Sequence, residues 1–247
     1  MTPGTPPEES SLLNETIRAH DPDGRWPTFT TFSARVTVGG DLWALKDVGG
    51  LFDDVVIDGD IREQRDTITP FPTAGSRGRF TPERTAIETL DGKAVDERLN
   101  PLAAFAGQER LTPWDAQQAL YFASYANWNY FVAPFIYRNE GFSVRETGDW
   151  DEDGRTLRRL EISYPEGFAT HSRVQTIYLD DSGLIARLDY SVDILGDAAA
   201  AHYPTSYQNF DGIMVPTKRL VYVRNTDGTP DRSSVSIDIE VAGITFA

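Results

Sequence analysis

Two hydrophobic periods alternate along the chain and divide it into elements. From residue 28 onward, most segments carry apolar side chains at every second position, which is typical of strands with one buried face. The clearest case has Leu184, Ala186, Leu188, Tyr190 and Val192 alternating with Arg187, Asp189, Ser191 and Asp193. Short turns rich in Gly and Asp separate these segments, so the pattern predicts roughly ten or eleven antiparallel strands.

Residues 112–137, TPWDAQQALYFASYANWNYFVAPFIY, interrupt this pattern with a helical period. One broad and largely aromatic stripe consists of Trp114, Leu120, Tyr121, Ser124, Tyr125, Trp128, Phe131, Val132 and Phe135. Because Phe122 and Tyr130 lie away from this stripe, little of the helix surface can face water. The rest of the chain must therefore cover the helix.

The ends of this helix are marked by residues with known end preferences. Thr112 followed by Pro113, with Asp115 in the first turn, predicts the start. Pro134 removes a hydrogen-bond donor and predicts the end.

Three other local predictions come from the same reading. A short amphipathic helix is expected from Ser10 or Ser11 to His20. Residues 28–46 are expected to form a hairpin that turns at residues 39–41, and residues 53–71 a long extended segment with a bulge or bend at Gly59.

The apolar faces of the strands and the apolar surface of the aromatic helix can cover each other in one architecture, mainly β with helices (α+β). We expect a single strongly curved antiparallel sheet, or open barrel, wrapped around the aromatic helix. No low-complexity linker interrupts the strands, so residues 10–247 are expected to form one domain. Residues 1–9 are rich in Pro and acidic residues and are expected to be a disordered tail.

Charge and composition exclude several classes of function. With 38 acidic and 23 basic side chains the net charge is −15, which repels phosphate backbones, so nucleic acid is not expected as a partner. The chain has no cysteine, which excludes disulfides and thiolate nucleophiles. Phosphate-binding loops, dinucleotide fingerprints and the usual metal-binding spacings are absent from the sequence, so neither a cofactor nor a metal is expected.

The N-terminus MTPGTPPEESS has neither a basic region nor an apolar run, and this predicts a cytoplasmic location. Polar residues interrupt the aromatic helix where about 20 mainly apolar residues are needed to span a bilayer, so no integral membrane segment is expected.

Several features together resemble the LolA/LolB-type lipoprotein carriers. These are a short N-terminal helix followed by Gly24 and Trp26, a long antiparallel meander, an apolar helical insertion, and the string F-D-G-I-x-V-P-T at residues 210–217. The resemblance implies an incomplete β-barrel curved around helices, with a hydrophobic concavity that accepts acyl chains. The export signal and the lipidated cysteine of those proteins are not seen in this sequence.

The surplus of aromatic side chains suggests a ligand site. The rings fit a packed core, and as a set they also fit the lining of an apolar pocket with phenolic hydroxyls as polar anchors. The candidate ligand-binding residues are Trp43, Tyr121, Tyr125, Trp128, Phe131, Phe135 and Tyr190. Arg79, in a Gly-rich loop, is a candidate for an anionic head group at the rim. The leading hypothesis is a protein that binds a hydrophobic small molecule or acyl chain.

Two alternatives stay open at this point. The first is a cofactor-independent enzyme, such as a cyclase, isomerase or hydrolase, that acts on an apolar substrate. Its candidate proton-transfer residues are His171, His202 and Tyr203, at least two of which must meet in one cavity. The second is a protein-interaction module whose sheet edge or concavity takes a partner segment.

Overall fold

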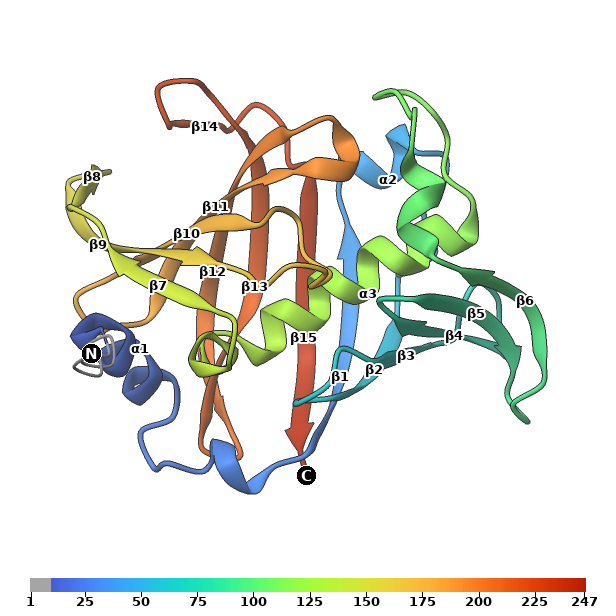
Figure 1. The fold of residues 1–247 in the computed structure, drawn as a ribbon, viewed down its shortest axis with the longest axis horizontal. Coiled ribbons are helices and arrows are strands. Elements are labelled where there is room, and N and C mark those ends of the chain that lie inside the picture. The colour runs from blue at the N-terminus through green and yellow to red at the C-terminus, as the bar shows by residue number, and fades with distance from the viewer. Residues whose placement is uncertain (1–9) are drawn as a thin grey trace, which may run out of the picture.

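The computed structural model describes residues 10–247, and the tail predicted for residues 1–9 lies outside them (Figure 1). The α-helices are α1 (Ser11–His20), α2 (Asp41–Leu45) and α3 (Ala116–Val132). Short 3-10 helices are η1 (Trp26–Thr28), η2 (Pro101–Phe105), η3 (Phe135–Arg138) and η4 (Asp193–Leu195).

The strands of the first half are β1 (Thr31–Gly39), β2 (Val55–Asp60), β3 (Asp66–Thr69), β4 (Ser76–Thr81), β5 (Arg84–Thr89) and β6 (Ala94–Leu99). Those of the second half are β7 (Ser143–Glu146), β8 (Trp150–Glu152), β9 (Arg155–Ser163), β10 (Val174–Leu179), β11 (Ile185–Val192), β12 (Ala198–Phe210), β13 (Ile213–Arg224), β14 (Pro230–Asp231) and β15 (Ile237–Phe246).

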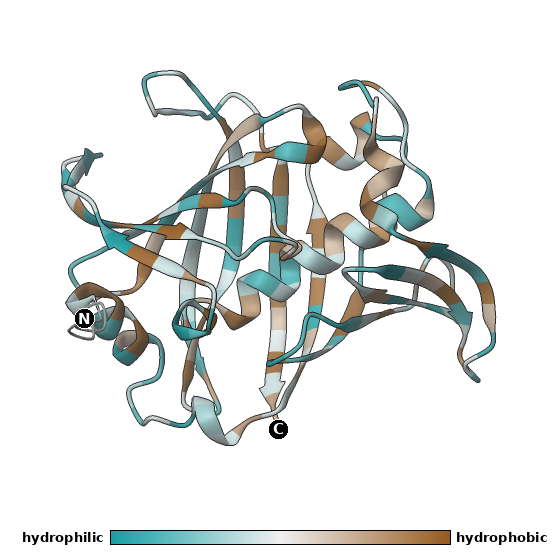
Figure 2. Cartoon of the chain, in the orientation of Figure 1, coloured by the Kyte–Doolittle hydropathy of each residue, from teal (hydrophilic) through white to brown (hydrophobic). Residues whose placement is uncertain are grey.

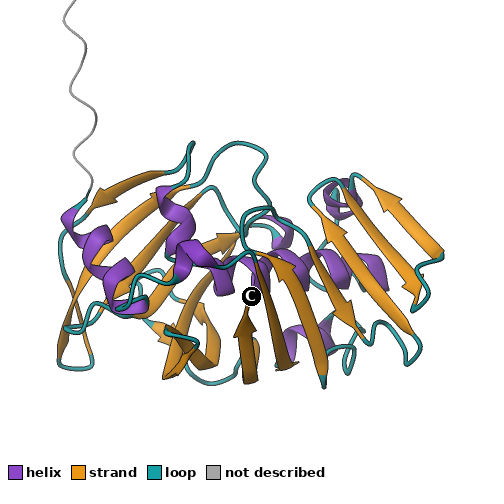
Figure 3. Ribbon diagram, turned by 90° about the horizontal axis from the view of Figure 1, so that it is seen from below, coloured by secondary structure: helices purple, strands orange, loops and turns teal. Residues whose placement is uncertain are grey.

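All these strands join one antiparallel sheet. Its order is β6-β5-β4-β3-β2-β1-β15-β13-β12-β11-β10-β9-β7, with β14 beside β13 and β8 beside β9. The sheet bends so that its two ends rise on either side of α3 (Figure 3). The predicted fold class, a strongly curved antiparallel sheet around the aromatic helix, is therefore confirmed.

Helix α3 lies in the concavity and is covered on every side. Fifteen of its 17 residues are buried, the exceptions being Ala116 and Tyr130. Figure 2 shows hydrophobic positions on the strands that pass behind it. Because both the helix and the inner face of the sheet are apolar, burying each against the other removes both surfaces from water.

The predicted N-cap of this helix is wrong by three residues. The Asp115 carboxylate, not the Thr112 hydroxyl, accepts the Gln118 backbone N–H at 2.9 Å, and the Gln118 side-chain oxygen accepts the Asp115 N–H at 3.0 Å. This reciprocal capping box satisfies two donors at once, which a lone threonine cannot do. Residues 112–114 remain outside the helix, where the Trp114 N–H donates to the Lys46 carbonyl.

Glycines allow two close approaches inside the concavity. A Cβ on Gly78 of β4 would collide with the Leu120 side chain of α3, so the missing side chain lets the helix settle on the sheet. Gly59 does not form the predicted bulge, because it keeps regular register with Phe32 and Asp66. A Cβ there would meet the Phe32 ring, which packs against α3.

Two further local predictions are wrong. Residues 41–45 form α2 instead of a hairpin strand, because Gly40 turns the chain at φ 110° and the Asp41 and Leu42 N–H groups donate to the carbonyls of residues 235 and 236. The long segment of residues 53–71 is two strands, β2 and β3, separated by a turn. By contrast, the predicted first helix is confirmed as α1, capped by the Ser10 hydroxyl.

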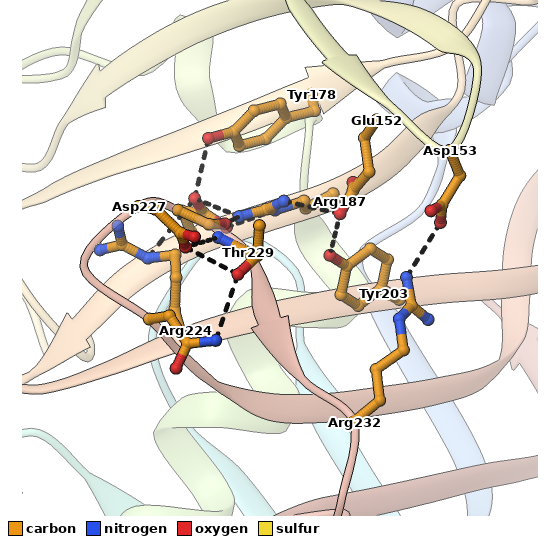
Figure 4. A network of polar contacts seen from close by, with 12 residues as sticks. Glu152, Asp153, Tyr178, Arg187, Tyr203, Arg224, Asp227, Thr229 and Arg232 are labelled. Atoms are coloured by element: carbon orange, nitrogen blue, oxygen red, sulfur yellow. Dashed lines mark hydrogen bonds and ion pairs between the residues drawn. The ribbon is translucent and has the colours of Figure 1, made fainter.

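The outer face of the sheet carries a buried ionic cluster centred on Arg187 of β11 (Figure 4). Its guanidinium is fully buried, binds both carboxylate oxygens of Asp189 at 2.7 and 2.9 Å, and also binds Glu152 at 2.9 Å. The rings of Tyr178 and Tyr203 lie 4.9 and 5.6 Å from it. The cluster joins the β8–β9 hairpin and the β13–β14 turn to the outer face.

Candidate functional site

A cavity of about 420 Å³ lies between α2, one side of α3 and the inner face of β11, β12, β13 and β15. Its rim includes the exposed residues Leu45, Arg110, Ala198 and Val223. Its inner wall is buried and includes Trp43, Phe122, Asn127, His171 and Tyr190.

The space exists because short side chains face one another across it. Ala123 and Ala126 of α3 lie one turn apart on the helix, and Ala200 of β12 lies on the opposing sheet face. Phe122, Val221 and Ile239 complete an apolar wall. The run AAAA at residues 198–201 is the sequence signal for this gap.

Four side chains form a hydrogen-bonded chain at the inner wall. The Tyr125 hydroxyl lies 3.1 Å from Nδ1 of His171, and the Tyr130 hydroxyl lies 2.8 Å from its Nε2. The Tyr130 hydroxyl also lies 3.0 Å from the Tyr190 hydroxyl. The ring of Tyr190 stacks on that of His171 at 4.3 Å, which fixes both rings against the cavity.

All four side chains of this hydrogen-bonded network are uncharged near neutral pH. Burial lowers the pKa of His171 to about 3 and raises the pKa of Tyr130 to about 12. Burial also raises the pKa values of Tyr125 and Tyr190 well above their usual range. A neutral imidazole has one donor and one acceptor nitrogen, so the arrangement favours hydrogen bonding over proton abstraction by His171.

A buried cation lies behind Tyr130. Arg219 of β13 donates to the Tyr130 carbonyl at 2.9 Å, lies 3.3 Å from Nε2 of His202, and places its guanidinium 5.0 Å from the Tyr130 ring centre. It forms no ion pair with a carboxylate among residues 10–247. Burial therefore lowers its pKa, and burial followed by the charge of Arg219 lowers the pKa of His202.

Another buried cation, Lys46, lines the cavity itself. The Lys46 ammonium donates to the carbonyls of Glu109 and Thr112, both at 3.2 Å, and lies 5.2 Å from the Trp114 ring centre. Burial lowers its pKa. Neither Lys46 nor Arg219 was predicted as a site residue, because each stands in an ordinary amphipathic segment whose sequence does not reveal its neighbours.

The predicted ligand-binding residues divide into four groups. Trp43 and Tyr190 line the cavity, and Tyr121 and Tyr125 line a second hollow of about 510 Å³ beside residues 165–173. Three others pack inside the core: Trp128 donates to the Asp60 carbonyl, Phe131 contacts Phe32 and Phe135 stacks on Trp26. Arg79 lies away from the cavity, 3.9 Å from Glu88.

The three residues suggested for proton transfer do not come together. His171 lines the cavity, and His202 lies behind Tyr130 with ring centres 4.6 Å apart. Tyr203 follows His202 in β12 and therefore faces the other side of the sheet, where its hydroxyl donates to Glu152 at 2.7 Å. Sequence reasoning missed Tyr130, which joins the two histidines, and Asn127.

No protein-family model and no curated protein matches this chain. Among solved structures, a LolA superfamily protein from Nitrosomonas europaea matches 96% of this chain and 92% of its own at 7% identity, with a TM-score of 0.51. A putative outer membrane lipoprotein-sorting protein domain from Vibrio parahaemolyticus matches 95% and 90% at 8% identity, with a TM-score of 0.49. The chain therefore has a LolA-like fold, which confirms the resemblance read from the sequence.

The prediction of a cytoplasmic location is wrong. This prediction is overturned by the LolA-like fold of the chain, which it shares with the LolA superfamily protein from Nitrosomonas europaea. The prediction was drawn from the first residues of the sequence, which do not determine the compartment. None of the helices within residues 10–247 has the length and apolar character needed to cross a membrane.

Proposed function

We propose that this protein binds an apolar small molecule or acyl chain in the cavity between α2, α3 and the inner face of the sheet, and that it acts outside the cytoplasm. The observation that carries the proposal is the 420 Å³ space itself, enclosed by apolar side chains in a concavity that α3 otherwise fills. Its volume falls within the range of about 300–1,000 Å³ that is common for small-molecule sites.

The wall has the composition expected of such a site. Phe122, Ala126, Val192 and Ile239 offer apolar surface, whose burial by a ligand is favourable by roughly 25 cal/mol per Å² before the costs of association. Among its polar groups, Tyr130 and Tyr190 lie against His171, which suits a site where hydrogen bonds orient a mainly apolar ligand. The LolA-like fold supports the same function, because the resemblance implies an acyl-binding concavity.

Titration with the neutral dye N-phenyl-1-naphthylamine tests the proposal, together with native mass spectrometry of the purified protein. We expect saturable dye binding by the natural chain and a large loss of binding in Ala200→Phe, whose ring fills the cavity from β12. Val174→Phe is the matched control, because Val174 is an exposed strand residue outside the cavity. If the dye does not bind, or binds Ala200→Phe equally well, the proposal is wrong.

A further inference from the structure

We infer that the molecule held in this cavity carries an uncharged hydroxyl group, which binds at the inner wall beside Tyr190, Tyr130 and Asn127. This inference rests on the proposed function and adds the chemical class of the ligand. It depends on buried polar atoms of the wall that the folded chain leaves without partners.

Asn127 of α3 supplies the first of these atoms. Its side chain lines the cavity and is only 3% exposed. Its amide nitrogen donates to the Ala123 carbonyl at 2.9 Å, and its amide oxygen has no hydrogen-bond partner within residues 10–247. A buried acceptor without a partner is costly, so a ligand that offers a hydrogen-bond donor relieves that cost.

Trp43 of α2 supplies a hydrogen-bond donor without a partner on the wall of the same cavity. It is 4% exposed, lines the wall, and its indole N–H finds no acceptor in the described part of the chain. The cavity therefore leaves one acceptor and one donor unsatisfied. A hydroxyl group is the smallest ligand group that both donates and accepts.

The hydrogen-bonded network of His171, Tyr130 and Tyr190 can either donate to such a hydroxyl group or accept from it, depending on which nitrogen of His171 carries the proton. If Nε2 of His171 carries the proton, it donates to the Tyr130 hydroxyl, which donates to Tyr190, and the Tyr190 proton is left for a ligand oxygen. If Nδ1 carries the proton, every donor reverses, and the Tyr190 oxygen can accept from the ligand. The Tyr190 hydroxyl has no other hydrogen-bond partner within residues 10–247, so it is the free end of the chain.

The surroundings disfavour a charged group at this position. A carboxylate would meet the unpartnered oxygen of Asn127 and would lose its hydration. The two cations nearby already hold other partners, because Lys46 donates to two carbonyls and Arg219 lies behind Tyr130 and donates to the Tyr130 carbonyl. An ammonium would meet the field of the buried Arg219 behind Tyr130. A neutral hydroxyl avoids both costs.

Displacement of N-phenyl-1-naphthylamine by three probes of equal chain length tests the inference in the natural protein. The probes are 1-dodecanol, its methyl ether, which keeps the oxygen but lacks the proton, and dodecanoate. We expect the alcohol to displace the dye at about three- to tenfold lower concentration than either of the others, as one hydrogen bond allows. Equal displacement by alcohol and ether, or strongest displacement by dodecanoate, overturns the inference and leaves the proposed function standing.

Two variants place the effect at the named atoms. Asn127→Leu and Tyr190→Phe are expected to reduce the preference for the alcohol to less than about twofold while retaining displacement by the ether. Tyr164→Phe is the control, because Tyr164 is a buried tyrosine whose hydroxyl bonds Tyr137 outside this cavity, and it should keep the full preference. A preference unchanged in both test variants contradicts the assignment, and failure of the natural protein to bind the dye removes the proposed function as well.

Discussion

The Tyr130 hydroxyl lies 2.8 Å from Nε2 of His171, and this contact joins α3 to the connection between β9 and β10. It joins a buried helix to a chain segment that reaches the cavity wall. Because the imidazole is buried among three tyrosines, its protonation state is linked to the stability of this part of the fold.

We expect the free energy of unfolding to fall as the pH drops below about 6.5. The pKa of His171 is lowered to about 3 and that of His20 to about 4, whereas both are about 6.5 in the unfolded chain. Between these limits the unfolded state binds protons that the native state does not, so stability is lost as the pH falls. Each histidine contributes a slope of up to about 1.4 kcal/mol per pH unit.

Urea unfolding of the natural chain and of His171→Gln at a series of pH values measures this slope. The variant is expected to show a shallower decline between about pH 6 and about pH 4, whatever its absolute stability. Parallel curves for the two proteins would show that His171 is not buried in its neutral form.

At Asp66 we expect the opposite dependence of stability on pH. Burial raises the pKa of its carboxyl to about 7, and the Ser124 hydroxyl of α3 donates to it at 2.7 Å. Its contribution to stability is therefore full below about pH 4 and is lost as the pH rises through about 7, where the buried group must ionise. We expect Asp66→Asn to gain up to about 4 kcal/mol relative to the natural chain between about pH 4 and about pH 8. Calorimetry at both pH values measures this, and an equal difference at both would refute it.

Substitutions at Gly78 and Leu120 test whether α3 lies directly on the sheet. Gly78→Ala is expected to destabilise the fold by roughly 1–3 kcal/mol, because the new methyl group overlaps the Leu120 side chain. In the Leu120→Ala background the same change should cost much less, since the added methyl group then occupies vacated space. Additive losses in the double variant would mean that the two residues do not touch.

Loss of Arg187 from its buried cluster should lower the stability of the fold far more than loss of a surface ion pair. Arg187→Ala removes the guanidinium from the buried carboxylates of Asp189 and Glu152 and is expected to cost about 3–5 kcal/mol. The hydroxyl donors of Tyr178 and Tyr203 and the longer contact with Arg224 remain, but they do not replace its paired charge. Arg35→Ala, which removes an equally well-formed but exposed pair with Asp54, should change the midpoint of thermal unfolding little. Similar losses in both variants would show that burial does not determine the strength of these pairs.

Regular periodicity made much of the fold predictable. The alternation in residues 184–193 and the aromatic helix both depend on local sequence, and the need to cover that helix led directly to a curved sheet. The predictions for residues 41–45 and for the cap at Thr112 were wrong, because they were decided by contacts with residues 235–236 and by the Asp115–Gln118 pair. Local propensity does not include such contacts.

The candidate site was less predictable than the fold. Trp43 and Tyr190 were anticipated from aromatic content alone, whereas Tyr130, Asn127 and Lys46 depend on which faces meet inside the sheet. A sequence identifies aromatic side chains but does not state which of them fill space and which border it. The short side chains at Ala123, Ala126 and Ala200 decide that, since the cavity is where they face one another.

Photolabelling with an apolar diazirine probe, such as a diazirine-bearing dodecanol, tests whether a ligand site lies inside the curved sheet. Peptide mapping is expected to find the label on residues 42–46, 122–130 and 190–200, and excess N-phenyl-1-naphthylamine is expected to suppress it. Label found mainly on exposed hydrophobic positions such as Leu99 and Val174, and not suppressed by the dye, would contradict the existence of a ligand site inside the sheet.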